Sequence, residues 1–204
     1  MTTAQPLKFE APDQGEETAR ADLYGVLAAL FYAPPSQELL SAIAAAPDEG
    51  DGVLRHAWRE LAAACAGMTP DRTRDEYESL FIGVGKPELI LYGSYYLSGF
   101  MMEKPLAALR TELATLGLQR GDKVTESEDH IASLCEVMRY LIASEEMSQA
   151  SVASQKQFFG THLQPWVIDM CSAIEAHPQA IFYRPVARLA KAFFEVEMQA
   201  FDMF

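Results

Sequence analysis

Cysteine and histidine are scarce in this 204-residue chain, and their spacing excludes several kinds of site. The three cysteines, Cys65, Cys135 and Cys171, are far apart and lie among apolar residues. An odd, widely spaced set provides neither a disulfide framework nor a CxxC metal or redox motif, which indicates a reducing compartment. The four histidines show no HExxH motif or other paired spacing. We therefore expect no metal site.

Positive charge and long apolar runs are also in short supply. The chain has 16 Lys and Arg against 29 Asp and Glu, a formal net charge of −13. This charge disfavours nucleic acid and anionic membranes and favours a basic partner such as a basic peptide, although many cytoplasmic proteins are acidic for solubility alone. No apolar run approaches the roughly 20 residues that span a bilayer, and residues 1–20 lack the features of a secretory or transit peptide. We expect a cytoplasmic protein with no direct membrane insertion.

No catalytic or phosphate-binding motif is complete. Gly83–Lys86 resembles the end of a P-loop, but Leu80 stands where the earlier glycine is required and Pro87 follows the lysine. The Asp, His and Ser side chains of residues 127–133 are neighbours on a predicted helix, so they point in different directions and do not form a triad. We expect a protein that is not an enzyme and has no cofactor.

Apolar residues recur at helical spacing along most of the chain. A first helix is predicted to end at Pro34, a second to start at Ser36, a third to carry Val53 to Cys65 and a fourth to start at Thr69. Further helices are predicted from Pro105 to Gly117, around Pro165 with a bend near that proline, and over Val186 to Phe194. No segment alternates with period two, so we predict an all-α, single-domain helical bundle over residues 17–204. Residues 1–16 are predicted to be a disordered tail.

The best-defined predicted helix runs from Thr125 to Ile142. Thr125 and Glu128 fit a capping box, which predicts that the helix begins at Thr125. Apolar residues at intervals of three and four form one stripe for burial: Ile131, Leu134, Cys135, Met138, Leu141 and Ile142. The opposite, polar face carries Asp129, Ser133, Glu136 and Tyr140, and His130 lies at the border.

Residues 82–99 interrupt the helical pattern. Four glycines and one proline occur here together with Tyr92, Tyr95 and Tyr96. We predict a long, aromatic- and Gly-rich loop, a feature that is more often functional than filler inside a compact domain. The tyrosines either pin the loop to the core or offer stacking faces to a ligand.

Three blocks between about Glu76 and Trp166 resemble the TorD/DmsD/NarJ family of molybdoenzyme-maturation chaperones. The matching residues are Tyr77, Leu80, Phe81, Gly85, Pro87, Tyr92, Ser94 and Tyr96, then Glu128, Asp129, His130, Glu136 and Met138, then Phe158, His162 and Trp166. The resemblance implies a cytoplasmic, system-specific chaperone that binds a molybdoenzyme precursor and holds it for cofactor insertion before export. The implied partner is a precursor of the dimethyl sulfoxide reductase, trimethylamine N-oxide reductase or formate dehydrogenase type, together with its twin-arginine signal peptide.

The same resemblance implies a signal-peptide groove between the aromatic loop and the start of the Thr125 helix. A twin-arginine peptide offers two guanidiniums and an apolar stretch, which call for carboxylates beside aromatic and aliphatic surface. The predicted client-binding residues are Tyr92, Ser94, Tyr95, Tyr96, Glu128, Asp129 and His130. Replacing Asp129 and His130 together is expected to weaken peptide binding with little loss of stability. Family loops often carry a second proline at the position where this chain has Leu91.

Two other interpretations stay open. The first is a small all-α nucleotide-binding protein or enzyme that uses Asp129, His130 and the Gly-rich loop, which a nucleotide-dependent rise in melting temperature would favour. The second is a general helical interaction module with no signal-peptide role. The chain is expected to be a monomer or a domain-swapped dimer.

Overall fold

The computed structural model describes residues 14–47, 52–121, 124–143 and 151–203. These residues form α1 (Gln14–Tyr32), α2 (Gln37–Ala45), α3 (Val53–Ala66), α4 (Pro70–Tyr77), the π-helical turn η1 (Glu78–Ile82), α5 (Gly93–Ser98), α6 (Lys104–Thr115), α7 (Ile131–Ala143), α8 (Val152–His162), α9 (Val167–Ala176) and α10 (Tyr183–Asp202). Within the described residues there is no strand, only one isolated bridge between Tyr92 and His130. The predicted all-α, single-domain fold is confirmed. No helix in these ranges is long and apolar enough to cross a membrane.

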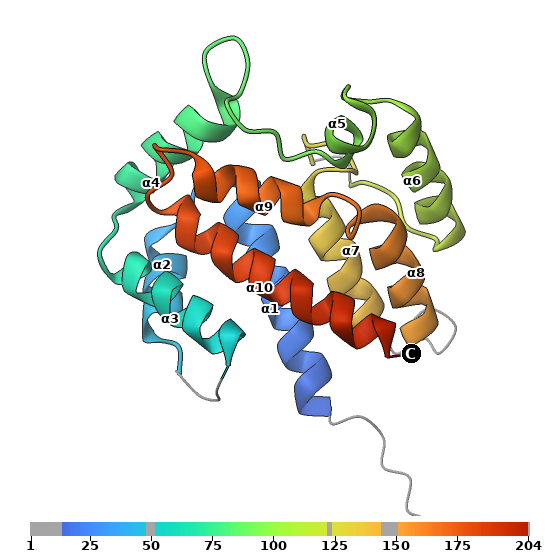
Figure 1. The fold of residues 1–204 in the computed structure, drawn as a ribbon, viewed down its shortest axis with the longest axis horizontal. Helices are drawn as coiled ribbons and strands as arrows, with labels where there is room; N and C mark the ends of the chain where they lie inside the picture. The colour runs from blue at the N-terminus through green and yellow to red at the C-terminus, as the bar shows by residue number, and fades with distance from the viewer. Residues whose placement is uncertain (1–13, 48–51, 122–123, 144–150, 204) are drawn as a thin grey trace, which may run out of the picture.

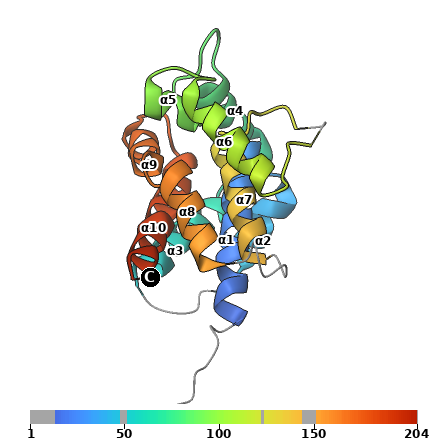
Figure 2. The same ribbon diagram turned by 90° about the vertical axis from the view of Figure 1, so that its right-hand side faces the viewer.

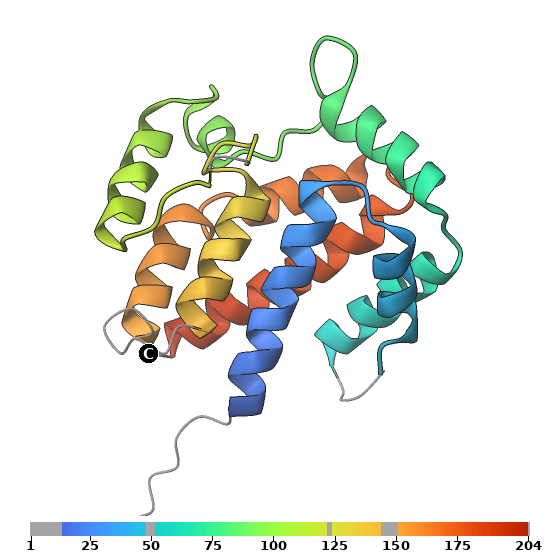
Figure 3. The ribbon, with the colours of Figure 1, turned by 180° about the vertical axis from the view of Figure 1, so that it is seen from behind.

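Two sets of helices enclose the core. Figure 1 shows α9 and α10 crossing the front of the molecule, with α1 passing behind them. From behind, α1 and α7 lie side by side, and α8 and α6 lie beyond α7 (Figure 3). The side view places α9 and α10 on one side and α1 and α7 on the other (Figure 2). The main helix contacts are those of α1 with α7, of α10 with α9 and α3, and of α2 with α3.

A buried polar network joins the two sets of helices within this core. The Arg20 guanidinium of α1 donates to both oxygens of the Glu197 carboxylate of α10 at 2.8 Å, and the Tyr24 hydroxyl donates to the same carboxylate at 3.0 Å. Glu197 is almost fully buried. A buried carboxylate is tolerated only when it is paired and hydrogen-bonded, so these contacts hold α1 and α10 in one relative position.

Two predicted helix starts are confirmed. The Ser36 hydroxyl accepts a hydrogen bond from the Leu39 amide at the start of α2. The Thr69 hydroxyl accepts one from the Arg72 amide at the start of α4, and Pro70 occupies the first helical position. These caps involve residues three apart in the chain, so local sequence is sufficient to predict them.

Other predicted boundaries are wrong. The single bent helix expected around Pro165 is two helices, α8 and α9, separated by residues 163–166, because proline cannot donate within a helix. Residues 14–16 belong to α1, so this helix begins before the predicted boundary at residue 17. Residues 1–13 of the predicted tail lie outside the described residues.

The predicted helix start at Thr125 is also wrong, because α7 begins at Ile131. Glu128 does not close a capping box; its carboxylate instead accepts hydrogen bonds from Arg110 of α6 at 2.9 and 3.0 Å. His130 caps the helix, since its Nδ1 accepts the Ala132 amide at 3.2 Å. The predicted apolar stripe is confirmed, because all six of its residues are buried.

The loop predicted over residues 82–99 is partly helical. Ile82 ends η1, and α5 occupies Gly93–Ser98, which leaves residues 83–92 irregular. At Gly83 the backbone is left-handed, and a Cβ would lie 2.2 Å from the Lys86 carbonyl oxygen, so this turn requires glycine.

Candidate functional site

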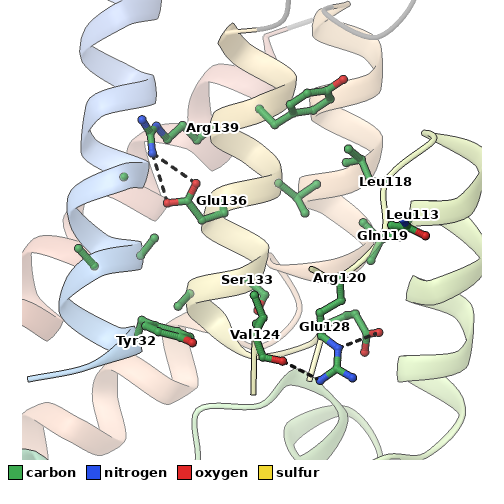
Figure 4. Close-up of a pocket in the computed structure, with 16 residues that line it drawn as sticks. Tyr32, Leu113, Leu118, Gln119, Arg120, Val124, Glu128, Ser133, Glu136 and Arg139 are labelled. Carbon is green, nitrogen blue, oxygen red and sulfur yellow. Dashed lines mark hydrogen bonds and ion pairs between the residues drawn. The ribbon is translucent and has the colours of Figure 1, made fainter. Parts of the chain in front are cut away.

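A groove of about 720 Å³ opens where α1, α7 and the segment preceding α7 meet (Figure 4). Its volume is within the range of roughly 300 to 1,000 Å³ that is typical of ligand pockets. The groove is lined by Gly25, Ala28, Ala29 and Tyr32 of α1, by Leu113 of α6, by Leu118, Gln119, Arg120, Val124 and Glu128, and by Ala132, Ser133, Glu136, Val137, Arg139 and Tyr140 of α7.

Small residues on two adjacent helices form the floor of this groove. Ala28 of α1 and Ala132 of α7 are buried, and Gly25 lies one turn before Ala28. Since α1 and α7 lie side by side, short side chains on the faces that meet leave a hollow between them. The longer side chains of Tyr32 and Tyr140 are partly exposed and form the rim.

Two carboxylates lie on this apolar surface, and each already contacts a guanidinium (Figure 4). Glu128 accepts hydrogen bonds from Arg110, and the Arg120 Nε lies 3.9 Å from its other oxygen. Burial raises the pKa of the Glu128 carboxyl, but the hydrogen bond from Arg110 and the charges of both arginines outweigh it and lower that pKa. Glu136 pairs with Arg139 of the same helix at 3.3 Å, and both side chains are about half exposed.

Beside this groove, the predicted site residue Asp129 joins two distant segments. One of its carboxylate oxygens accepts the Ser94 amide of α5 at 2.9 Å, and the other accepts the Ser127 hydroxyl. The Gly93 amide donates to the Asp129 carbonyl, also at 2.9 Å. Asp129 is only 4% exposed. Its carboxylate therefore caps α5 from outside the helix and fixes the backbone that leads into α7.

His130 and Tyr92 meet at the isolated bridge. Their rings pack edge to face with centroids 4.9 Å apart, and the Tyr92 hydroxyl donates to the Glu126 carboxylate. His130 is 2% exposed. Burial lowers the pKa of His130 to about 4, although the charges of Glu126 and Asp129 partly oppose the change. The ring is therefore neutral near pH 7, with its proton on Nε2 because Nδ1 accepts the Ala132 amide.

The remaining predicted residues lie on α5. Ser94 is buried, and its hydroxyl accepts the Met102 amide at 3.1 Å. Tyr96 stacks on Trp166 with centroids 5.3 Å apart and donates to a backbone carbonyl, so it pins α5 to the core. Tyr95 is 42% exposed and offers its ring to solvent.

The seven predicted residues thus form one cluster, and Glu128 is the member that lines the groove. Their role in client binding stays a prediction. The expectation that Asp129 and His130 can be replaced with little loss of stability conflicts with their burial and their backbone hydrogen bonds. In the described part of the chain, no three His, Cys, Asp or Glu side chains are grouped so as to hold a metal ion.

Sequence reasoning missed the contribution of α1 to the groove. Three groove residues of α7 were identified only as its polar face: Ser133, Glu136 and Tyr140. For α1, the available signal was the small residues Ala21, Gly25 and Ala28 at helical spacing in a helix otherwise rich in large apolar residues.

Comparison with known proteins decides the family. Residues 48–172, more than half of the chain, match the nitrate reductase delta subunit family. The chain belongs to this family. The resemblance to the TorD/DmsD/NarJ proteins is therefore confirmed.

Curated relatives include proteins named chaperone protein TorD. The one from Vibrio cholerae serotype O1 is 28% identical over 137 residues, which are 62% of this chain and 61% of the relative. The one from Vibrio parahaemolyticus serotype O3:K6 is 25% identical over 130 residues, 60% of each protein. The match thus spans about three fifths of the length of these relatives.

A solved structure has the same fold. It is the crystal structure of a protein from Archaeoglobus fulgidus that is described as a redox enzyme maturation protein. The match covers 94% of this chain and 99% of the chain in that structure, with a TM-score of 0.60 and 21% identity. At this identity the similarity establishes the arrangement of the helices.

Proposed function

We propose that this protein is a system-specific chaperone that binds a molybdoenzyme precursor and holds it for cofactor insertion before export. Membership of the nitrate reductase delta subunit family and the similarity to TorD chaperones support this proposal. The protein would act in the cytoplasm, where such a precursor is made, and it would do so without catalysing a reaction. The client would be a reductase of the dimethyl sulfoxide or trimethylamine N-oxide type or a formate dehydrogenase.

The groove between α1 and α7 is the proposed binding site for the client's twin-arginine signal peptide. The observation that carries this proposal is the combination of an apolar floor with the carboxylates of Glu128 and Glu136. Such a peptide has two adjacent guanidiniums and an apolar stretch. Guanidiniums bind carboxylates through charge-assisted hydrogen bonds, and the apolar stretch would gain free energy by covering Ala29 and Val137.

The charge of the whole chain favours the same partner. A net charge of −13 attracts a cationic peptide and accelerates its encounter with the protein. In this proposal Tyr95 supplies an exposed ring on α5. The other predicted residues would support the groove without touching the peptide, because they hold α5 and the segment that leads into α7 in place: Asp129, His130, Ser94, Tyr92 and Tyr96.

Calorimetric titration of the full chain with synthetic twin-arginine signal peptides tests this proposal. Copies of each peptide in which glutamine replaces both arginines serve as controls. We expect the peptide with arginines to bind and the double replacement to weaken binding at least tenfold, since hydrogen bonds to charged groups contribute about 1.5 to 3 kcal/mol each. Equal affinity for the two peptides would contradict an electrostatic role for the groove.

A further inference from the structure

We propose that Arg139 occupies the Glu136 carboxylate in the free protein and that a guanidinium of the client peptide replaces it on binding. This inference rests on the proposed function, because it concerns how the same groove recognises its peptide. In the free protein, the Arg139 side chain then covers the groove beside Glu136. Glu136 pairs with a guanidinium in both states, first that of Arg139 and then that of the client.

The position of Arg139 supports this exchange. Its side chain lines the groove and lies against Gly25 of α1, where a Cβ would come within 3.3 Å of the Arg139 Cδ and Nε atoms. Figure 4 shows the guanidinium between α1 and α7, turned toward the Glu136 carboxylate. The absence of a side chain at residue 25 thus provides the space in which Arg139 lies across the groove.

The Glu136–Arg139 pair is weak enough to exchange. Its nitrogen–oxygen distances are 3.3 and 3.4 Å, and the two side chains are 54% and 51% exposed. Exposed pairs of this kind change an equilibrium by about fivefold or less. A client arginine whose neighbours also cover the apolar floor has additional contacts that Arg139 lacks, so the exchange favours the peptide.

The ion pairs of Glu128, unlike that of Glu136, are not suited to exchange. Arg110 donates two hydrogen bonds to it from α6, and Arg120 contacts it while donating to the carbonyl oxygens of Val124 and Glu126 at 3.2 Å. These arginines fasten the segment that leads into α7, so their release would loosen the wall of the groove. Arg139 has a role confined to the groove surface, which makes it the exchangeable guanidinium.

Exchange also keeps the charges balanced. When Arg139 leaves, a client guanidinium takes its place, so Glu136 is paired with a guanidinium before and after binding. Arg139 is half exposed and turns into water at little cost. A lysine in the peptide would replace the planar guanidinium less well, because its ammonium cannot form two parallel hydrogen bonds to a carboxylate.

The test is titration of Arg139→Gln with a synthetic peptide in which two adjacent arginines precede an apolar stretch. If Arg139 competes with the peptide, its removal should tighten binding about two- to fivefold. Glu136→Gln should weaken binding, and the double variant should lose the gain of Arg139→Gln. Arg139→Lys should lie between the wild type and Arg139→Gln.

Arg74→Gln is the matched control. Arg74 on α4 is also 51% exposed, pairs with Asp71 three residues away and does not line the groove, so its removal changes the net charge equally. A gain as large in Arg74→Gln, or affinity of Arg139→Gln equal to or below that of the wild type, would overturn the exchange. Failure of both the wild type and Arg139→Gln to bind any peptide would overturn the proposed function as well.

Discussion

The Asp129 carboxylate accepts hydrogen bonds from the Ser94 amide and the Ser127 hydroxyl in a site that is almost closed to water. The sequence singles out Asp129 and His130 as an unusual pair, and both lie beside the groove. Their burial could not be predicted, because it depends on α5, which begins more than thirty residues earlier in the chain. The pair was predicted to contact the client peptide, and in the structure both side chains accept backbone amides of α5 and α7.

Replacing Asp129 with alanine should therefore destabilise the fold. The substitution leaves the Ser94 amide buried without a partner, and hydrogen bonds to charged groups contribute about 1.5 to 3 kcal/mol each. We expect the free energy of unfolding, measured by urea denaturation, to fall by about 3 kcal/mol. Glu136→Gln, at a half-exposed residue, should change it by less than about 1 kcal/mol. A loss below about 1 kcal/mol in Asp129→Ala would show that the buried contacts are replaceable.

His130 makes stability depend on pH. Its pKa is about 4 in the folded protein and is expected near 6.5 in the unfolded chain, so only the unfolded chain takes up the proton between these values. The free energy of unfolding should thus fall as pH decreases from about 6.5 to 4, by up to about 1.4 kcal/mol per pH unit. The lowered pKa of Glu128 acts in the same direction, because its stabilising ion pairs are lost at low pH.

Comparison with His130→Asn isolates the histidine. Asparagine does not titrate, and its oxygen can accept the Ala132 amide in place of Nδ1. In urea denaturation at several pH values, the free energy of unfolding of this variant should fall less steeply with decreasing pH than that of the wild type. The part of the fall that is due to carboxylates should persist. If the free energy of unfolding fell equally with pH in the wild type and the variant, the histidine would take up its proton equally in the folded and unfolded states.

At the scale of the element, the caps of α2 and α4 were predictable because each capping hydroxyl lies three residues from the amide it accepts, whereas the cap of α10 was not. Ser36 and Thr69 cap their own helices. The start of α10 has no local side-chain cap; instead the Glu76 carboxylate of α4 accepts the amides of residues 181–183 at 2.8 to 2.9 Å. Such a contact between residues more than a hundred positions apart leaves no short-range signal.

Glu76→Ala should weaken the attachment of α10 to α4. Three amide donors at a helix start lose a charged acceptor, and we expect the free energy of unfolding to fall by about 2 to 3 kcal/mol. Glu76→Gln, which keeps one acceptor oxygen, should lose less. The neighbouring exposed residue provides a control, since Glu78→Ala should change stability by less than about 0.5 kcal/mol. Equal urea midpoints for Glu76→Ala and Glu78→Ala would contradict this capping role.

At the scale of the whole molecule, the fold class and the family were predictable, but the groove was not. Helical periodicity and the three matching blocks are local features, and both expectations are confirmed. The groove forms only when small residues of α1 meet the polar face of α7, roughly a hundred residues later in the chain. Sequence spacing identifies each face separately but does not show that the two faces meet.

The central claim is that the client peptide binds in this groove, and filling the groove tests it most directly. Ala29 is exposed on α1 and lines the groove, whereas Ala63 is exposed on α3 and does not. Titration of Ala29→Trp and Ala63→Trp with the same twin-arginine peptide should show at least a tenfold loss of affinity in Ala29→Trp and wild-type affinity in Ala63→Trp. Wild-type affinity in a folded Ala29→Trp variant would place the peptide elsewhere on the molecule and contradict the claim.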